Sequence, residues 1–185
     1  MEAVYTIAPA AKDELIMIEE LQKTIGWDPF KKTHLIIAAI SPEGLLFGKV
    51  EGKMVASILA TKYSKTFGFI GVYYVKKLYR GKGYGYQIFV KAMEFLSDCE
   101  ILALDSVEEQ VPNYSKWGFQ VACNTTKRSI RNVPKVDEVH LTRIVSKLAD
   151  LPLEKVLQFQ DKMLPAFTNR YLKVAFEIGR PFVSL

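Results

Sequence analysis

The spacing of apolar residues changes along the chain, and each change predicts a new element of secondary structure. Residues 3–7 alternate weakly between apolar and polar side chains and are followed by Pro9, a pattern that is typical of a short first strand. Apolar positions at helical spacing come next, and Pro29 stands where proline favours the start of a helix. These signals predict two helices, over residues 10–25 and 28–40.

A hairpin and a strand-helix-strand unit are predicted in the middle of the chain. Alternating residues on both sides of Glu51-Gly52 indicate a β-hairpin. Two apolar strands separated by an amphipathic helix follow, and strands joined in this way are expected to be parallel. The predicted elements are hairpin strands 45–50 and 53–62, a strand 66–75 antiparallel to the second of these, a helix 86–96 and a buried strand 101–105.

The pattern is weaker in the last third of the chain. It predicts a short helix over 110–116, strands over 119–130 and 139–145, and helices over 153–163 and 168–178. The order of the elements argues for an α+β fold, with a mixed, mostly antiparallel sheet flanked by helices. We expect one sheet domain over residues 1–146 and a helical C-terminal extension over residues 147–185.

Composition narrows the class of protein. The 185 residues are 49% hydrophobic and carry a formal charge of +5, and the basic residues are spread out, which disfavours nucleic acid as a partner. The start of the chain has no signal-peptide pattern, and no apolar run reaches the ~18 residues of a membrane span. Cys99 and Cys123 are isolated and lack the spacing of metal ligands. We therefore expect a soluble, cytoplasmic protein without a metal.

The stretch Arg80–Gly85, with the sequence RGKGYG, carries the main candidate chemistry. It joins an apolar strand to a helix, where glycines let the backbone approach a ligand and first-turn N–H groups can bind phosphate. A dinucleotide fingerprint is excluded because Tyr86 or Ile88 stands where its third glycine is needed. A P-loop is excluded because Gly83 follows Lys82. An ordinary solvated turn would have the same composition.

The spacing around this turn resembles a known motif. Val75, Arg80, Gly83 and Gly85 stand as they do in the acyl-CoA-binding motif of the GNAT superfamily of N-acetyltransferases, and residues 114–119, YSKWGF, resemble that superfamily's second motif. The resemblance covers roughly residues 3–132. It implies a GNAT-like acyl-CoA N-acyltransferase fold, whose strand before the glycine turn is bulged and splays from its parallel neighbour. It also implies an acetyl-CoA-dependent acyltransferase, in which a primary amine attacks acetyl-CoA directly in a ternary complex.

The resemblance assigns roles to individual residues. Tyr114 would be the general acid that protonates the departing thiolate of coenzyme A. The alternative is that the Tyr114 side chain only fills the core. Asp105 would be the general base, with Glu108, Glu109 or a water chain as alternatives. The expected cofactor-binding residues are Tyr74, Val75, Lys77, Arg80, Gly81, Lys82, Gly83, Tyr84, Gly85 and Asn113, although Asn113 would also suit a helix cap.

Some positions depart from the superfamily pattern. Val107 and Gln110 stand where an asparagine and an alanine are common, and the strand 66–75 lacks a carboxylate. These departures leave open an alternative, a non-catalytic acyl-CoA-binding or protein-interaction module on the same fold. The amine acceptor is not identified, and the chain would be a monomer or a homodimer. The sequence also looks like that of proteins with a second acetyltransferase-like half, to which residues 180–185 would lead.

Overall fold

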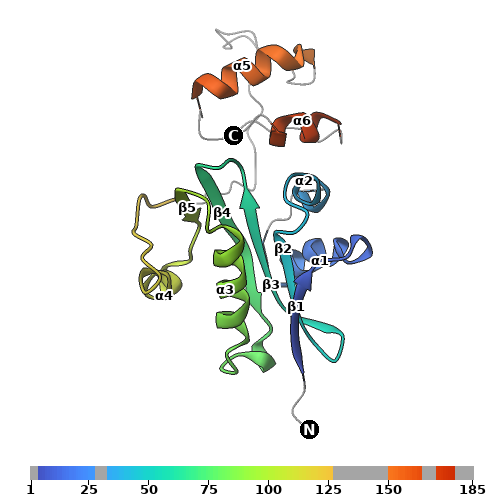
Figure 1. The fold of residues 1–185 in the computed structure, drawn as a ribbon, viewed down its shortest axis with the longest axis vertical. Coiled ribbons are helices and arrows are strands. Elements are labelled where there is room, and N and C mark those ends of the chain that lie inside the picture. The colour runs from blue at the N-terminus through green and yellow to red at the C-terminus, as the bar shows by residue number, and fades with distance from the viewer. Residues whose placement is uncertain (1–3, 28–32, 127–149, 164–169, 178–185) are drawn as a thin grey trace, which may run out of the picture. The chain divides into compact units, whose positions relative to one another are not determined.

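A five-stranded sheet carries the fold, and its strands lie side by side in the order of the sequence (Figure 1). The structure, a computed structural model, describes residues 4–27, 33–126, 150–163 and 170–177. The strands are β1 (Tyr5–Pro9), β2 (Leu45–Val50), β3 (Lys53–Lys62), β4 (Phe67–Val75) and β5 (Ile101–Leu104). The helices are α1 (Ile16–Thr24), α2 (Thr33–Ile40), α3 (Tyr84–Phe95), α4 (Val111–Ser115), α5 (Leu153–Met163) and α6 (Arg170–Glu177).

The sheet is mixed, as predicted. Strands β1 to β4 form an antiparallel meander, and β5 pairs with β4 in parallel. The β2–β3 hairpin turns at Glu51 and Gly52, whose φ angles of 50° and 75° are those of a tight hairpin turn. The predicted hairpin and the predicted parallel pair are therefore both confirmed.

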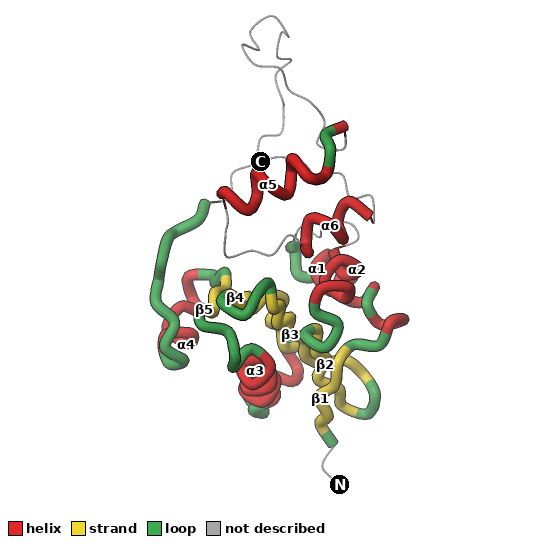
Figure 2. The backbone as a smooth tube through the Cα atoms, turned by 45° about the horizontal axis from the view of Figure 1, so that its top comes forward, coloured by secondary structure: helices red, strands yellow, loops and turns green. Residues whose placement is uncertain are grey.

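Helices cover both faces of the sheet. Figure 2 shows α3 on one face and α1 with α2 on the other. The α3 face buries Ile88, Phe89 and Ala92, at the spacing of one helix side. On the other face, a cluster joins the start of α1 to the sheet through Leu15, Ile18, Leu45, Phe47, Met54 and Leu59. Both faces of the central strands are thus buried, and α3, the helix that follows β4, packs against this core.

Contacts divide the chain into two compact units. The first contains residues 1–105 and 152–185, and the second contains residues 106–151. Helices α5 and α6 match the predicted pair and belong to the first unit, where Tyr171 of α6 lies 6.3 Å, centroid to centroid, from Tyr63 after β3. The second unit contains a 3₁₀ turn, Glu108–Gln110, and α4. The domain boundary at residue 146 stays a prediction.

One predicted strand is wrong over its described residues, 119–126. Residues 119–126 of the expected strand 119–130 have no regular structure. Strand propensity alone does not make a strand, because each backbone N–H and C=O also needs a partner in a ladder. Residues 127–130 and the predicted strand 139–145 lie outside the described residues.

Smaller differences fall at the start of the chain. The first strand runs from Tyr5 to Pro9 rather than over 3–7, with its proline at the end of an edge strand, where a missing N–H is tolerated. The predicted helix 10–25 is divided into a 3₁₀ turn, Lys12–Glu14, and α1. The Glu14 carboxylate accepts a 3.0 Å hydrogen bond from the Ala11 N–H and pairs with Lys49 of β2, which ties this turn to the sheet.

Candidate functional site

Strand β4 separates from β5 halfway along its length. The parallel ladder begins at Phe67 and ends where Ile70 pairs with Leu104, whereas β4 continues to Val75. Asp105 directly follows the last paired residue of β5 and is exposed at the point of separation. Beyond this point, the edge of β4 that faced β5 has no ladder partner among the described residues. An extended ligand can use such backbone groups as hydrogen-bond partners.

A bulge in β4 coincides with the separation. Leu59 of β3 pairs with Gly71 and Ser57 pairs with Tyr74, so two residues of β4 stand opposite one residue of β3. Val72, the first of the two, has a φ of 48°, which is rare for a β-branched residue. The fully buried Ser57 donates a 2.9 Å hydrogen bond from Oγ to the Val72 carbonyl. This side chain thus satisfies a carbonyl that the bulge removes from the regular ladder.

The glycine turn leads directly from β4 into α3. Gly81 and Gly83 have φ angles of 75° and 77°, in the left-handed region that glycine adopts without strain. Gly83 is the N-cap of α3 and has no side chain with which to cap the first turn. The N–H groups of a first helical turn have no acceptor within the helix, and they carry the positive end of its dipole. The start of α3 is therefore suited to an anion.

Basic side chains lie at this turn, and two of them make cation–π contacts with aromatic rings. Arg80 Nε donates a 3.0 Å hydrogen bond to the Val75 carbonyl, and its guanidinium lies 5.7 Å from the Tyr74 ring centroid. Lys82 Nζ lies 5.6 Å from the ring centroid of Tyr79. The structure places nine of the predicted cofactor-binding residues along this one junction of β4 with α3, and they are Tyr74, Val75, Lys77, Arg80, Gly81, Lys82, Gly83, Tyr84 and Gly85.

The remaining predicted residues lie on α4, in the second unit. Tyr114 is half-buried, its ring meets Phe119 edge-on at 6.3 Å between centroids, and burial raises the pKa of its hydroxyl. Asn113 donates a 2.8 Å hydrogen bond from its side-chain amide to Oε1 of Gln110. Because Gln110 is the N-cap of α4, the alternative role of Asn113 as the helix cap is wrong.

A residue from the start of the chain also reaches the turn. Tyr5 of β1 stacks on Tyr84 with ring centroids 4.1 Å apart, and its hydroxyl donates a 3.1 Å hydrogen bond to the Tyr84 carbonyl. Neither Tyr5 nor Ser57 is among the site residues predicted from the sequence. A weak signal for Ser57 existed, because a serine in an apolar, fully buried strand needs a hydrogen-bond partner. The signal for Tyr5 was weaker still, since nothing in a short edge strand indicates what lies across the sheet.

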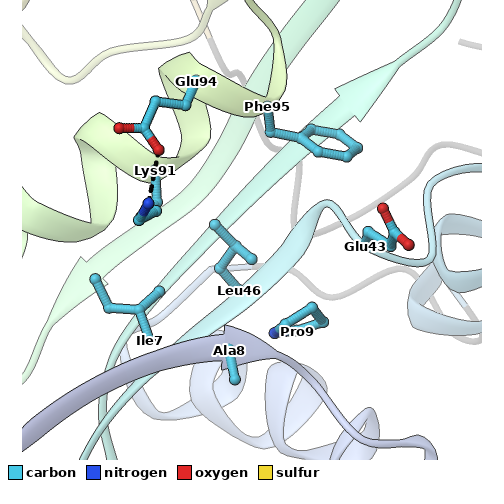
Figure 3. A pocket seen from close by; sticks show the side chains of 8 residues that line it. All are labelled: Ile7, Ala8, Pro9, Glu43, Leu46, Lys91, Glu94 and Phe95. Atoms are coloured by element: carbon cyan, nitrogen blue, oxygen red, sulfur yellow. Dashed lines mark hydrogen bonds and ion pairs between the residues drawn. The ribbon is translucent and has the colours of Figure 1, made fainter.

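A shallow pocket lies elsewhere on the first unit. It has a volume of about 450 Å³ and lies between the β1–β2 edge and the second half of α3 (Figure 3). Its rim carries a 2.7 Å ion pair between Lys91 and Glu94. The lining residues are Ile7, Ala8, Pro9, Glu43, Leu46, Lys91, Glu94 and Phe95. Since the glycine turn is at the opposite end of α3, none of the predicted site residues lines this pocket.

Neither a cluster of metal ligands nor a membrane-spanning helix is present within the described ranges. There, no three side chains of His, Cys, Asp or Glu come together as ligands for a metal ion. No helix in that part of the chain has the length and the apolar character needed to cross a bilayer.

A family model and a curated relative match the sequence of this chain. A model of the Acetyltransferase (GNAT) family matches residues 5–119. Holothin acyltransferase from Pseudoalteromonas sp. (strain SANK 73390) is 28% identical over 160 residues, which make up 86% of this chain and 53% of the relative. This chain thus spans about half the length of that relative.

Solved structures have the same fold. A Pyrococcus horikoshii protein, provisionally named an acetyltransferase, superposes with a TM-score of 0.69 at 18% identity, over 97% of this chain and 65% of that one. A predicted acetyltransferase from Clostridium acetobutylicum, crystallised with acetyl-CoA, superposes with a TM-score of 0.53 at 14% identity, over 68% and 96% of the two chains. The family match covers more than half of the chain and includes the splayed strand, the bulge and the glycine turn. This chain belongs to the GNAT family of acetyltransferases.

Proposed function

We propose that this protein is an acetyl-CoA-dependent N-acetyltransferase, which moves an acetyl group to a primary amine. The observation that carries the proposal is the continuous junction of a splayed, bulged strand with a glycine turn at the start of α3. The strand offers backbone groups to an extended ligand arm, and the turn offers N–H groups and positive charge to phosphate. Coenzyme A combines such an arm with a pyrophosphate, and the relative's name and the Clostridium structure support this choice of ligand.

The residues of the junction fit this ligand. The amides of Arg80 to Gly85 would hold the pyrophosphate, with Arg80, Lys82 and Lys77 supplying charge. Each charge–dipole contact is worth about 0.3–1 kcal/mol, so several amides together outweigh any one side chain. Backbone groups of Tyr74 and Val75 would pair with the pantetheine arm. The Val75 carbonyl already accepts the hydrogen bond from Arg80 Nε, which leaves the other nitrogens of that guanidinium for phosphate.

The chemistry requires two proton transfers. Acetyl-CoA, when bound, supplies a thioester carbonyl to the amine, so a C–N bond forms as the C–S bond breaks. Asp105, exposed where β4 and β5 separate, would accept the proton that the amine loses. Tyr114 would donate its phenolic proton to the departing sulfur, and the raised pKa keeps that proton in place at neutral pH. Asn113, beside Tyr114, would contact the ligand from α4.

Thiol release from acetyl-CoA with a panel of small amines, amino acids and peptides tests the activity. We expect release above the hydrolytic background with at least one amine, and Tyr114→Phe should lower that rate roughly 10²-fold or more with little change in acetyl-CoA affinity. Tyr171→Phe on α6 is the matched control and should keep the full rate. Tight acetyl-CoA binding without turnover on any amine would instead favour a non-catalytic acyl-CoA-binding module, to which the departures at Val107 and Gln110 also point.

A further inference from the structure

The side chain of Tyr5 connects the edge of the sheet to the first residue of α3. The Tyr5 and Tyr84 rings are stacked with an angle of 12° between their planes, and the Tyr5 hydroxyl donates a hydrogen bond to the Tyr84 carbonyl. The two contacts together fix both the ring and the peptide of Tyr84. We propose that Tyr5 is a positioning residue for acyl-CoA binding, which holds the first peptide of α3 in place for the pyrophosphate. This inference rests on the proposed function, because it assigns the glycine turn to that ligand.

The hydrogen bond acts on a peptide that matters for an anion. The carbonyl that accepts the Tyr5 hydroxyl and the N–H of Gly85 belong to the same peptide unit. That N–H points toward the N-terminal end of α3, as all helical N–H groups do. A hydrogen bond to the oxygen of an amide polarises the amide and strengthens its N–H as a donor. Tyr5 would therefore orient this donor and also strengthen it.

Two glycines leave the room that this arrangement needs. A Cβ atom on Gly48 of β2 would lie 2.6 Å from Cζ and 2.7 Å from Cε2 of Tyr5. A Cβ atom on Gly85 would lie 2.7 Å from the Tyr73 hydroxyl. Neither glycine has a φ in the left-handed region, so the backbone conformation does not require glycine at these positions. What excludes a larger residue is the pair of tyrosine side chains that converge on the start of α3.

The Tyr5 hydroxyl stays a donor over the whole physiological range of pH. Its desolvation, together with the neighbouring Tyr73 and Tyr84 hydroxyls, raises the pKa of Tyr5 to about 12. The hydrogen bond to Tyr84 is therefore not lost by ionisation at any pH at which the enzyme would work.

Calorimetry on Tyr5→Phe tests the proposal, with Tyr171→Phe as the control. Acetyl-CoA is compared with S-acetylpantetheine, which has the same arm and thioester but no pyrophosphate. We expect Tyr5→Phe to bind acetyl-CoA about three- to tenfold more weakly than the unmodified protein. Its affinity for S-acetylpantetheine should be unchanged, and Tyr171→Phe should bind both ligands normally. A general loosening of the fold would weaken both ligands together.

The other outcomes are distinguishable. If the unmodified protein binds acetyl-CoA and Tyr5→Phe binds it equally well, or loses both ligands to the same extent, the positioning role is wrong while the proposed function stands. If the unmodified protein does not bind acetyl-CoA at all, the proposed function is overturned and the role of Tyr5 with it.

A double-mutant cycle with Gly48 gives an independent result. Gly48→Ala should weaken acetyl-CoA binding when Tyr5 is present, because the new methyl group displaces the ring. In a Tyr5→Ala background the same substitution should have little effect, since no ring is left to displace. An equal loss of affinity in both backgrounds would contradict the proposal.

Discussion

The Ser57 hydroxyl donates a 2.9 Å hydrogen bond to the carbonyl of Val72, the residue at which β4 bulges away from its neighbours. Ser57 is fully buried, and Val72 holds a φ of 48°. A buried polar side chain on β3 thus stabilises an unfavourable backbone conformation on β4, next to the point where β4 leaves β5. We expect the geometry of the proposed acyl-CoA site to depend on this pair.

Replacing Ser57 by alanine should destabilise the protein. The substitution leaves the Val72 carbonyl without its buried donor, and such a loss costs roughly 1–3 kcal/mol in the free energy of unfolding. Urea denaturation measures the effect, and the midpoint should fall without a change in the m-value. An unchanged midpoint would mean that the bulge does not depend on this hydrogen bond.

Glycine should be better tolerated than alanine at Val72. Both substitutions remove the two Cγ methyl groups that pack against the α1 side of the core, and glycine removes Cβ as well. Only glycine, however, relieves the positive φ, which costs about 1–2 kcal/mol for other residues. Val55, buried in β3, is the matched control, because glycine in an ordinary strand is less stable than alanine by about 0.5–1 kcal/mol. The unfolding free energies should therefore rank in opposite orders at the two positions. The same order at both would argue against strain at Val72.

Alanine at Gly83 should affect acetyl-CoA binding, whereas alanine at Gly52 should not. The two glycines have φ angles of 77° and 75°, and a Cβ at either would meet no atom closer than 3.9 Å. Each substitution should thus cost a similar 1–2 kcal/mol, roughly, through backbone strain alone. Only Gly83 lies at the start of α3, so only there should acetyl-CoA affinity also fall, on the order of tenfold. Equal acetyl-CoA affinities in the two variants would mean that the glycine turn is not part of the binding site.

The Glu14–Lys49 pair should make stability depend on pH. The Lys49 hydrogen bond, followed by the one from the Ala11 N–H, lowers the pKa of Glu14. A carboxylate with a lowered folded-state pKa stabilises the fold above its unfolded pKa, and the contribution is lost as pH falls through the folded value. The melting temperature of Glu14→Gln should therefore lie below that of the unmodified protein at pH 7, by the small amount expected of a partly exposed ion pair. This difference in melting temperature should shrink as the pH falls below 4.5, the ordinary pKa of a glutamate side chain. A gap that does not vary with pH would contradict this role.

Features set by neighbouring residues could be predicted from the sequence. The Glu51-Gly52 hairpin and the glycine turn follow from local φ preferences, and the parallel pairing of β4 with β5 follows from the helix between them. Features that depend on distant pairing could not. Tyr5 and Tyr84 are 79 positions apart, and their contact depends on β1 lying at the sheet edge across from α3.

The strand predicted over residues 119–126 is wrong for the same reason, because no local pattern shows whether a partner strand is available. A bulge in this strand is expected from the family resemblance, but its position at Val72 could not be predicted from the residues. A β-branched residue argues against a positive φ, and the hydroxyl that satisfies the Val72 carbonyl comes from β3.

The central claim is that the β4–α3 junction binds acyl-CoA, and calorimetric titration of the unmodified protein with acetyl-CoA tests it most directly. We predict saturable binding of one molecule per chain, with a dissociation constant on the order of 1 mM or tighter. Inorganic pyrophosphate should compete, and S-acetylpantetheine should bind much more weakly. The absence of any binding heat at millimolar acetyl-CoA, with no displacement of a fluorescent CoA analogue in a parallel titration, would contradict the claim.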